Sequence, residues 1–444
     1  MTSQRILILA NLCAARKTAA FAGNRLKHPP TQPGGQANIK VLLSSIGSRG
    51  DVQPILALAL ELRALGHDAR LCVPPNFQEW VESFGLICLP IGPDLKQLTA
   101  APVKGPSPRP SAGQLRQLAV QTVRAQFPVL TEAARGCDLI LAAGALQIAT
   151  RSVAEALEIP YVFVAYCPAV LPSPDHPPPK MGTHYSQSLS GSANVSLWLD
   201  EEQQWNGLFR ETLNEGRAKT QLAPVESVQR HIFTDNPWLA ADPVMAPAGV
   251  TADLQILQPG AWPLSDQSAL PDHVEQFLAS GEVPVYFGFG SMRVAEQTSR
   301  VLIEAARTLG LRSIISQGWG NLAPVDAETD CLSIGEVAHE KLFARVAVVM
   351  HHGGAGTTIA AAEAGRAQII VPHLYDQYYW ANRVQQLGVG VAGPAHEHLT
   401  VDAVVCALRE SLQPAMTAHA QALAARIQGR GATLAAERLV NDFA

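Results

Sequence analysis

The 444-residue chain has few of the features that are typical of nucleic-acid-binding, disulfide-rich, zinc-binding or membrane-spanning proteins. Only 16% of its residues are charged and its net charge is −5, which argues against a nucleic-acid partner. Its seven cysteines form no Cys-x-x-Cys pair and no zinc-type spacing, so neither a disulfide scaffold nor a zinc site is indicated, and a cytoplasmic location is expected. No apolar run approaches the ~20 residues of a membrane-spanning helix. We therefore expect no integral membrane contact.

Acidic residues are missing from the beginning of the chain, where Asp51 is the first. A basic, acid-free start can be a targeting segment, but no sustained apolar core or cleavage site accompanies it here. Residues 1–38 are therefore predicted to be a disordered extension or the product of an upstream start codon.

Apolar, strand-like runs alternate with helix-length amphipathic stretches over the rest of the chain. The strands are expected at 39–45, 69–73, 86–90, 139–142, 161–165, 285–288, 312–316, 347–350 and 368–371. The helices are expected at 53–65, 78–84, 115–134, 145–157, 201–219, 294–309, 357–364 and 378–387, with one or two more over 414–444. This alternation indicates β-α-β units, which build parallel sheets covered on both faces.

The length favours two domains, because single cores stop growing at ~250–300 residues. We predict an α/β protein with two Rossmann-like, doubly wound domains, at 39–257 and 284–444, joined by residues 258–283. The last helix is a candidate to return to the first domain. Between 168 and 179 a proline-rich stretch excludes helix and central strand and predicts a surface loop. Its prolines are Pro168, Pro172, Pro174, Pro177, Pro178 and Pro179.

The sharpest motif covers residues 349–358, where a strand ends, a glycine-rich turn follows and a helix begins. Free N–H groups at a helix start, with the helix dipole, favour bound phosphate. His351 and Thr357 could add hydrogen bonds. The glycines that would let a phosphate approach are Gly353, Gly354 and Gly356. An ordinary strand-to-helix turn is the alternative.

Three further polar residues also follow predicted strands. Asp376 and Gln377 pair a charged acceptor with an amide, which suits neighbouring hydroxyls of a sugar. Taken alone, a helix N-cap at Asp376 is the better interpretation. Ser291 could reach the same phosphate, or could belong to a plain turn.

Asp51 lies where the first strand passes into the first helix. It could be the N-cap of that helix, with Pro54 in the first turn. It could equally be a general base that faces a cleft between the domains. The residues alone leave both interpretations open.

Taken together, these motifs resemble the family 1 glycosyltransferases of the GT-B fold. The resemblance is greatest to the bacterial branch that glycosylates natural products, typified by vancomycin-type aglycone glycosyltransferases, and to sterol glucosyltransferases. It covers about residues 39–440. The stretches that carry it are 47–54, 166–179, 235–247, 284–292, 335–339, 351–358 and 376–377.

The resemblance implies a role for each position. Asp51 would take the acceptor's proton, while His351, Ser291 and the turn from Gly353 to Thr357 would hold the donor's pyrophosphate. Asp376 and Gln377 would hold the transferred sugar. The base and ribose would lie near Gly335, Glu336 and Val337, and the acceptor near Gly50, Tyr166 and Pro168. Plant relatives orient a histidine base with an acid after a later strand, but here that strand is followed by Ala143-Gly144, so Asp51 would act without a partner.

The implied reaction is an inverting transfer of a hexose from UDP-glucose or a dTDP-sugar to a hydroxyl of a hydrophobic natural product, sterol or lipid. No metal or other cofactor is expected, because the helix N-terminus and His351 would stabilise the charge of the leaving group. The chain agrees with this, since it contains no Asp-x-Asp. Peripheral membrane contact is expected only if the acceptor is a lipid. The alternatives are a sugar-nucleotide 2-epimerase, which has no need of the proline-rich loop, and a non-catalytic binding protein, which has no need of Asp51.

Overall fold

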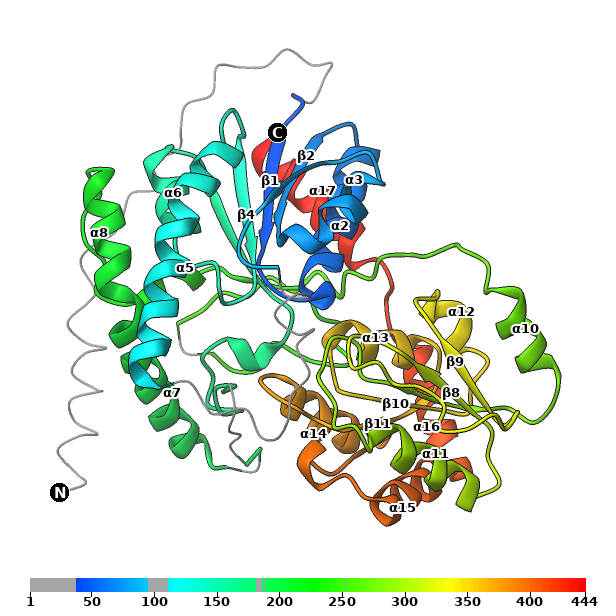
Figure 1. Cartoon of the computed structure of the whole chain (residues 1–444). Helices are drawn as coiled ribbons and strands as arrows, with labels where there is room; N and C mark the ends of the chain where they lie inside the picture. Colours follow the sequence, from blue (N-terminus) through cyan, green and yellow to red (C-terminus); the bar gives the residue numbers. More distant parts are fainter. Residues whose placement is uncertain (1–36, 95–110, 181–185, 188, 252) are drawn as a thin grey trace, which may run out of the picture. The chain divides into compact units, whose positions relative to one another are not determined.

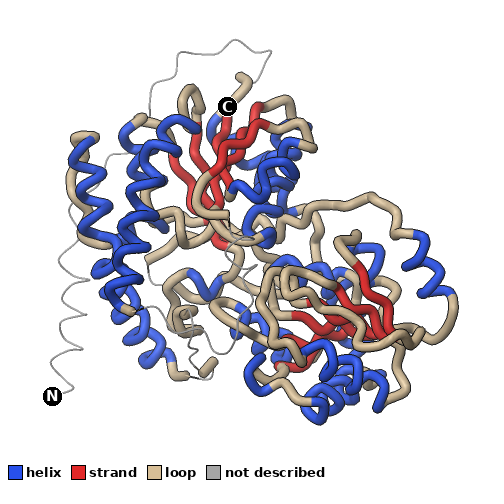
Figure 2. The backbone as a smooth tube through the Cα atoms, viewed as in Figure 1, coloured by secondary structure: helices blue, strands red, loops and turns tan. Residues whose placement is uncertain are grey.

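The computed structural model describes residues 37–94, 111–180, 186–187, 189–251 and 253–444. It contains two six-stranded parallel sheets with helices on both faces (Figures 1 and 2). Their strand orders are β3-β2-β1-β4-β5-β6 and β12-β11-β10-β7-β8-β9, so each sheet is doubly wound about its first strand. This confirms the predicted α/β fold with two Rossmann-like halves. The predicted extension, residues 1–38, lies outside the described residues except for its last two.

The first sheet is formed by residues 40–239. Its strands are β1 (Lys40–Ser45), β2 (Asp68–Val73), β3 (Ile87–Pro90), β4 (Leu139–Ala143), β5 (Tyr161–Ala165) and β6 (Trp238–Leu239). Its helices are α2 (Arg49–Ala64), α3 (Gln78–Glu82), α5 (Ala112–Ala133), α6 (Thr150–Ala156), α7 (Gly191–Trp205), α8 (Glu211–Lys219) and α9 (Val228–Phe233), with short turns η1 (Pro75–Phe77) and η2 (Pro168–Val170). All five residues of β4 are buried, because helices cover both faces of the sheet.

The second sheet is formed by residues 285–392. Its strands are β7 (Val285–Gly288), β8 (Ser313–Ser316), β9 (Cys331–Ile334), β10 (Val348–His351), β11 (Ala367–Ile370) and β12 (Gly390–Ala392). The helices of this half are α10 (Asp272–Ala279), α11 (Thr298–Thr308), α12 (His339–Phe343), α13 (Ala355–Glu363), α14 (Gln377–Gln386), α15 (Val401–Ser411) and α16 (Pro414–Ala424). The segment predicted as the connection between the halves, 258–283, therefore contains a helix, α10.

The last helix, α17 (Gly431–Phe443), returns to the first half and packs beside α2 (Figure 1). Its buried residues Ala435 and Leu439 belong to the same apolar cluster as α2. The chain crosses tightly before this helix, because a Cβ on Gly431 would lie 2.2 Å from the carbonyl oxygen of Ala261. Residues Asn38–Ala444 thus form one unit.

Several predicted boundaries were wrong. The helices predicted at 145–157 and 294–309 begin at Thr150 and Thr298, and the one predicted at 201–219 begins at Gly191 and contains a π-helical turn, Asn206–Arg210. Strands β6, β9 and β12 were not predicted. They are two to four residues long and lie at the sheet edges, where burial produces little hydrophobic pattern.

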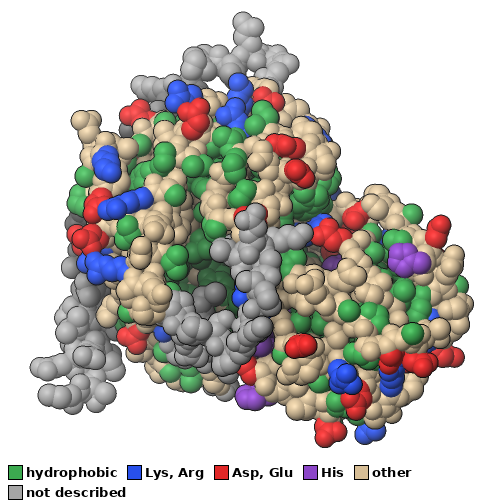
Figure 3. All heavy atoms as spheres, in the orientation of Figure 1, with side chains coloured by type: hydrophobic (Ala, Val, Ile, Leu, Met, Phe, Trp, Pro, Cys, Tyr) green, Lys and Arg blue, Asp and Glu red, His purple; other side chains and the backbone are tan. Residues whose placement is uncertain are grey.

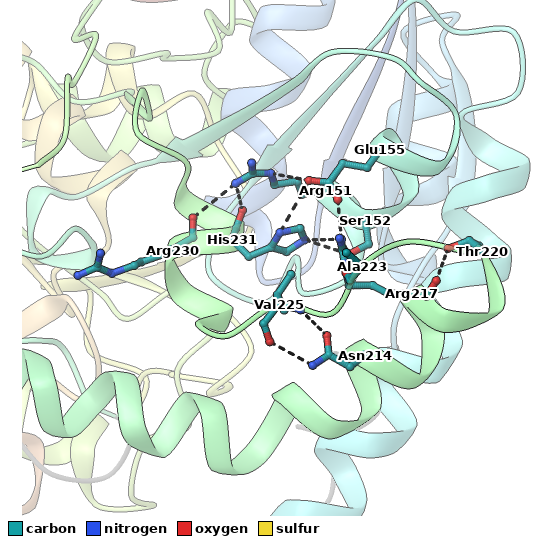
Figure 4. Close-up of polar contacts among 10 residues, drawn as sticks. All are labelled: Arg151, Ser152, Glu155, Asn214, Arg217, Thr220, Ala223, Val225, Arg230 and His231. Carbon is teal, nitrogen blue, oxygen red and sulfur yellow. Dashed lines mark hydrogen bonds and ion pairs between the residues drawn. The ribbon is translucent and has the colours of Figure 1, made fainter. Parts of the chain in front are cut away.

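A buried polar network joins α6, α8 and α9 (Figure 4). Arg217 is 6% exposed and donates to the carboxylate of Glu155 at 2.5 Å and to the hydroxyl of Ser152 at 3.0 Å. The Nε2 atom of His231 lies 2.9 Å from that hydroxyl. Burial, together with Arg151 and Arg217, lowers the pKa of His231 to about 3. The network pairs each buried charge and so holds the three helices together.

Candidate active site

Asp51 lies at the carboxyl end of β1, in the first turn of α2. Its Oδ2 atom accepts hydrogen bonds from the backbone N–H of Ser48 at 2.7 Å and from the Ser48 hydroxyl at 3.1 Å. The N-cap of α2 is therefore Ser48, and Asp51 is the third helical residue of a capping box. This corrects the capping alternative, which made Asp51 the N-cap, and the helix boundary, which falls at Arg49 instead of Gln53.

The surroundings of Asp51 are shaped by glycines. A Cβ on Gly47 would lie 2.2 Å from Oδ2, and one on Gly144 would lie 3.9 Å from Oδ1. Ser48 thus anchors one carboxylate oxygen of Asp51. The other oxygen lies toward Gly144, which follows β4 and has no side chain. Burial raises the pKa of Asp51 to about 6 against the lowering effect of the Ser48 hydrogen bonds. A carboxylate in this range can accept a proton near neutral pH.

The residues predicted near the acceptor adjoin this turn. The hydroxyl of Tyr166 donates to the backbone carbonyl of Asp51 at 2.9 Å, so it holds the turn in place. Pro168 is buried at the start of η2, and Gly50 is exposed within the first turn of α2.

Asp376 precedes α14 in the second half. It occupies the N-cap position, but its side chain makes no capping hydrogen bond; its Oδ2 atom accepts one from Trp380 Nε1 at 3.2 Å. Burial raises the pKa of Asp376 to about 7, and the negative charge of Asp51 contributes. The structure therefore brings the two carboxylates, which come from different halves, within electrostatic reach of each other.

Gln377 organises the loop before α14. Its Oε1 atom accepts from the backbone N–H groups of His373 at 2.8 Å and Leu374 at 3.1 Å. Its Nε2 atom lies 3.4 Å from the sulfur of Met292. The amide is thus engaged within the fold, which differs from the expected direct contact with the sugar.

The glycine-rich turn joins β10 to α13. Gly353 has φ +92°, and a Cβ there would lie 2.6 Å from the side chain of Ile370, so the position requires glycine. The first intrahelical bond is donated by Thr358 N–H to the carbonyl of Gly354, at 2.9 Å. The N–H groups of residues 355–357 therefore precede the helical ladder and are available to an anion. Gly354, Gly356 and Thr357 lie on this turn as predicted.

The ring of His351 is not free to bind a ligand at this turn. It is fully buried; its Nδ1 atom accepts from Gly353 N–H at 3.1 Å, and its Nε2 atom lies 2.9 Å from Gln368 Oε1. Burial lowers its pKa to about 4. Because both ring nitrogens are engaged inside the fold, the expected hydrogen bond from His351 to phosphate does not match this geometry.

His352, which was not predicted as a site residue, lies beside two turns: the glycine-rich turn after β10 and the turn after β7 that contains Gly290. A Cβ on Gly354 would lie 2.6 Å from its Nε2 atom, and one on Gly290 would lie 3.1 Å from its Cε1 atom. Its Nδ1 atom is buried and makes no hydrogen bond to any described residue. Alternation along a strand could have indicated this, because neighbouring residues at a strand end point to opposite sides.

The remaining predicted donor residues follow β7 and β9. Ser291 is half-buried next to Gly290. Gly335 and Glu336 are exposed and Val337 is half-buried, directly after β9. The carboxylate of Glu336 forms an ion pair with Arg49 of the first half.

Within the part of the chain that the structure describes, no group of three or more His, Cys, Asp and Glu side chains could hold a metal ion. Among the same residues, no helix is both long and apolar enough to cross a bilayer. Charged side chains are scattered over the face shown in Figure 3 without a patch of one sign, in line with the low charge of the chain.

The doubly wound halves, with a glycine turn in one and a half-buried carboxylate in the other, have the architecture of the GT-B fold, and two family models identify the chain as a glycosyltransferase. Residues 41–172 match the glycosyltransferase family 28 N-terminal domain. Residues 330–433 match the erythromycin biosynthesis protein CIII-like C-terminal domain. Among solved structures, the glycotransferase of kitacinnamycin has a TM-score of 0.68 at 16% identity, covering 92% of this chain and 100% of that one. Glycosyltransferase VinC, solved in complex with DTDP, has a TM-score of 0.64 at 18% identity, covering 91% and 100%.

Comparison with individual relatives narrows the family to which the chain belongs. The chain is 42% identical to the vancomycin aglycone glucosyltransferase of Amycolatopsis orientalis, over 91% of this chain and 97% of the relative. It is 38% identical to the dTDP-epi-vancosaminyltransferase of the same organism, over 86% and 92%. The sterol 3-beta-glucosyltransferase UGT80A2 of Arabidopsis thaliana is 30% identical over 79% of this chain and 57% of its own length. The chain belongs to the family of vancomycin-type glycosyltransferases and is a sugar-transferring enzyme.

Proposed function

We propose that the enzyme transfers a hexose, with inversion, from a UDP- or dTDP-activated sugar to a hydroxyl of a hydrophobic natural-product acceptor. The observation that carries this proposal is Asp51, a half-buried carboxylate with a pKa near 6 that is anchored through one oxygen and whose negative charge contributes to the raised pKa of Asp376. One relative supports the acceptor class by its name, vancomycin aglycone glucosyltransferase, and the name of another, dTDP-epi-vancosaminyltransferase, supports a dTDP-activated donor. A sterol or lipid acceptor is supported less, because the sterol relative is more distant.

Asp51 acts as the general base in a single displacement. The acceptor hydroxyl gives its proton to the Asp51 carboxylate as its oxygen forms a bond to the anomeric carbon. The bond from that carbon to the diphosphate breaks on the opposite face, and the nucleoside diphosphate leaves with the electron pair. The start of α13, with its free N–H groups at residues 355–357, stabilises the departing charge. His352 is the histidine that we propose adds a hydrogen bond to the diphosphate, and the proposed step uses no metal.

Asp376 holds the transferred sugar in this proposal. Because its pKa is near 7, it is partly protonated at neutral pH and can both donate to and accept from sugar hydroxyls. Gln377 contributes indirectly, by shaping the loop that presents Asp376. Gly335, Glu336 and Val337 lie after β9, where the nucleoside would bind at the carboxyl end of the sheet.

The acceptor is proposed to bind beside the proline-rich loop after β5. This loop contacts the start of α14, because Tyr375 N–H donates to the carbonyl of Lys180 at 3.3 Å. The ring of His176 meets that of Tyr379 edge to face at 6.0 Å. Aromatic side chains therefore border the region next to Asp376, which suits a large hydrophobic acceptor.

Donor and acceptor can be found in two steps. Thermal shift with a panel of nucleotide sugars identifies the donor, and mass spectrometry of products from a pool of hydrophobic alcohols and phenols identifies the acceptor. Release of nucleoside diphosphate only when an acceptor is present would exclude both a 2-epimerase and a binding protein. Release at the same rate without acceptor would contradict the proposal.

A further inference from the structure

Arg49 links the turn that carries Asp51 to the second half. It is the first residue of α2, and its guanidinium forms an ion pair with Glu336, which follows β9. The Cζ atom of Arg49 also lies 4.5 Å from the centroid of the Trp80 ring on α3, a cation–π distance. Trp80 therefore supports the guanidinium on one side while Glu336 binds it on another.

A second contact, between two aromatic rings, also joins the two halves. The rings of Phe77 and Trp319 stack with centroids 6.4 Å apart and planes inclined by 23°. The backbone N–H of Trp319 donates to the carbonyl of Gly290 at 2.8 Å, and Gly290 borders the ring of His352. The first half is thus tied to the loops after β8 and β9, and through Trp319 to the turn after β7.

The charge around Arg49 favours this arrangement. Asp266, in the connection between the halves, has a lowered pKa because of hydrogen bonds from Ser268, and the positive charge of Arg49 contributes. The pKa of His339 is lowered to about 4 by burial and, further, by Arg49. Arg49 therefore pairs with Glu336, and its positive charge stabilises the ionised form of Asp266 and disfavours a second cation nearby.

We propose that Arg49 is a positioning residue, which with Glu336 and Trp80 forms a latch that holds the Asp51 turn against the donor-binding loops. This inference rests on the proposed function, because it assigns the latch to the placement of the base. The side chains of Arg49 and Glu336 are 39% and 79% exposed. An exposed pair of this kind is weak, so the latch can open and close between turnovers.

A double-mutant cycle tests the latch. The variants are R49Q, E336Q, the double variant and the charge reversal R49E/E336R. The control is R345Q, which breaks an ion pair within the second half between Arg345 and Glu275, whose side chains are 42% and 47% exposed. We expect R49Q, which loses both the ion pair and the cation–π contact, to lower kcat about threefold to tenfold, and E336Q, which keeps the contact of Arg49 with Trp80, to lower it less. The double variant should be no slower than R49Q, and R345Q should match the parent. The reversal should be faster than the double variant but slower than the parent, because a glutamate at position 49 loses the cation–π contact with Trp80.

Two readouts separate the latch from other roles. The dissociation constant of UDP or dTDP, measured by calorimetry, should be unchanged in R49Q, and small-angle scattering should give R49Q a larger radius of gyration than the parent or R345Q. Losses that multiply in the double variant, a reversal that recovers nothing, an unchanged radius, or weaker nucleotide binding with unchanged kcat would each overturn the latch. Because scattering needs no turnover, a parent protein without transferase activity would contradict the proposed function and still leave the latch testable.

Discussion

We expect Asp51→Asn to remove the base while keeping the first turn of α2. Asparagine has the size of aspartate, and its side-chain oxygen can still accept the 2.7 Å hydrogen bond from Ser48 N–H. The lost property is the ability to accept the acceptor's proton. A positioned general base contributes ~10²–10⁴-fold to rate, so kcat should fall by that factor.

The effect on stability follows from the pKa of Asp51. Burial raises it from 3.8 to about 6, which means that the folded state disfavours the charged form. Below pH 3.8 the group is neutral in both states and costs nothing; the cost grows as pH rises to about 6 and is complete above it. At ~1.4 kcal/mol per pKa unit, ionised Asp51 costs the fold up to about 3 kcal/mol at neutral pH. Asp51→Asn should therefore be as stable as the parent at pH 7, or more stable.

The assay is release of nucleoside diphosphate with a proven donor and acceptor, together with denaturant unfolding. The parent rate should rise with pH through the range near 6, and the slow rate of Asp51→Asn should not. Donor affinity should be unchanged, because the donor binds mainly to the second half. A well-folded Asp51→Asn protein that transfers sugar at close to the parent rate would refute the assignment, and the base would have to be another group near Asp376.

The remaining predictions concern donor binding and the fold. His352→Ala should weaken binding of the nucleoside diphosphate by ~1.5–3 kcal/mol, the value of a charge-assisted hydrogen bond, whereas His351→Ala should lower stability by ~1–3 kcal/mol through the freed Gln368; calorimetry and melting temperature distinguish the two, and the opposite pattern would restore His351 to the phosphate. Asp376→Ala should raise the KM for the nucleotide sugar far more than the dissociation constant of the free nucleoside diphosphate, and equal losses would favour a capping role. Arg217→Met should cost ~1.5–3 kcal/mol of unfolding free energy, because it removes the charge-assisted hydrogen bond to Glu155, which is 33% exposed and keeps its ion pair with Arg151, with kcat of the folded protein kept; near-parent stability would show that the network in Figure 4 contributes little.

The sequence was sufficient for the fold class because buried parallel strands have a strong signature. The run of β4 is apolar throughout and that of β10 is apolar up to its last residue, His351, and the structure buries every residue in both. The glycine-rich stretch was also placed correctly between a strand and a helix. Clustered glycines are typical of tight turns, such as the one in which Gly353 has φ +92°. The short edge strands lack such a signal.

Side-chain direction was harder to predict than position. His351 and His352 are adjacent, and only the register of β10 determines that the first points into the fold. The capping box of α2 was missed because Ser48 and Asp51 both suit an N-cap by residue type. The pairing of Arg49 with Glu336 joins distant parts of the sequence and depends on how the halves pack, which local patterns do not report.

The anomeric configuration of the product tests the central claim most directly. With an α-linked nucleotide sugar as donor and an acceptor found by mass spectrometry, nuclear magnetic resonance of the purified product reports the new linkage. A single displacement with Asp51 as base predicts the β-glycoside of the acceptor. An α-glycoside would contradict the single displacement, and a product in which only the sugar nucleotide has changed would contradict glycosyl transfer.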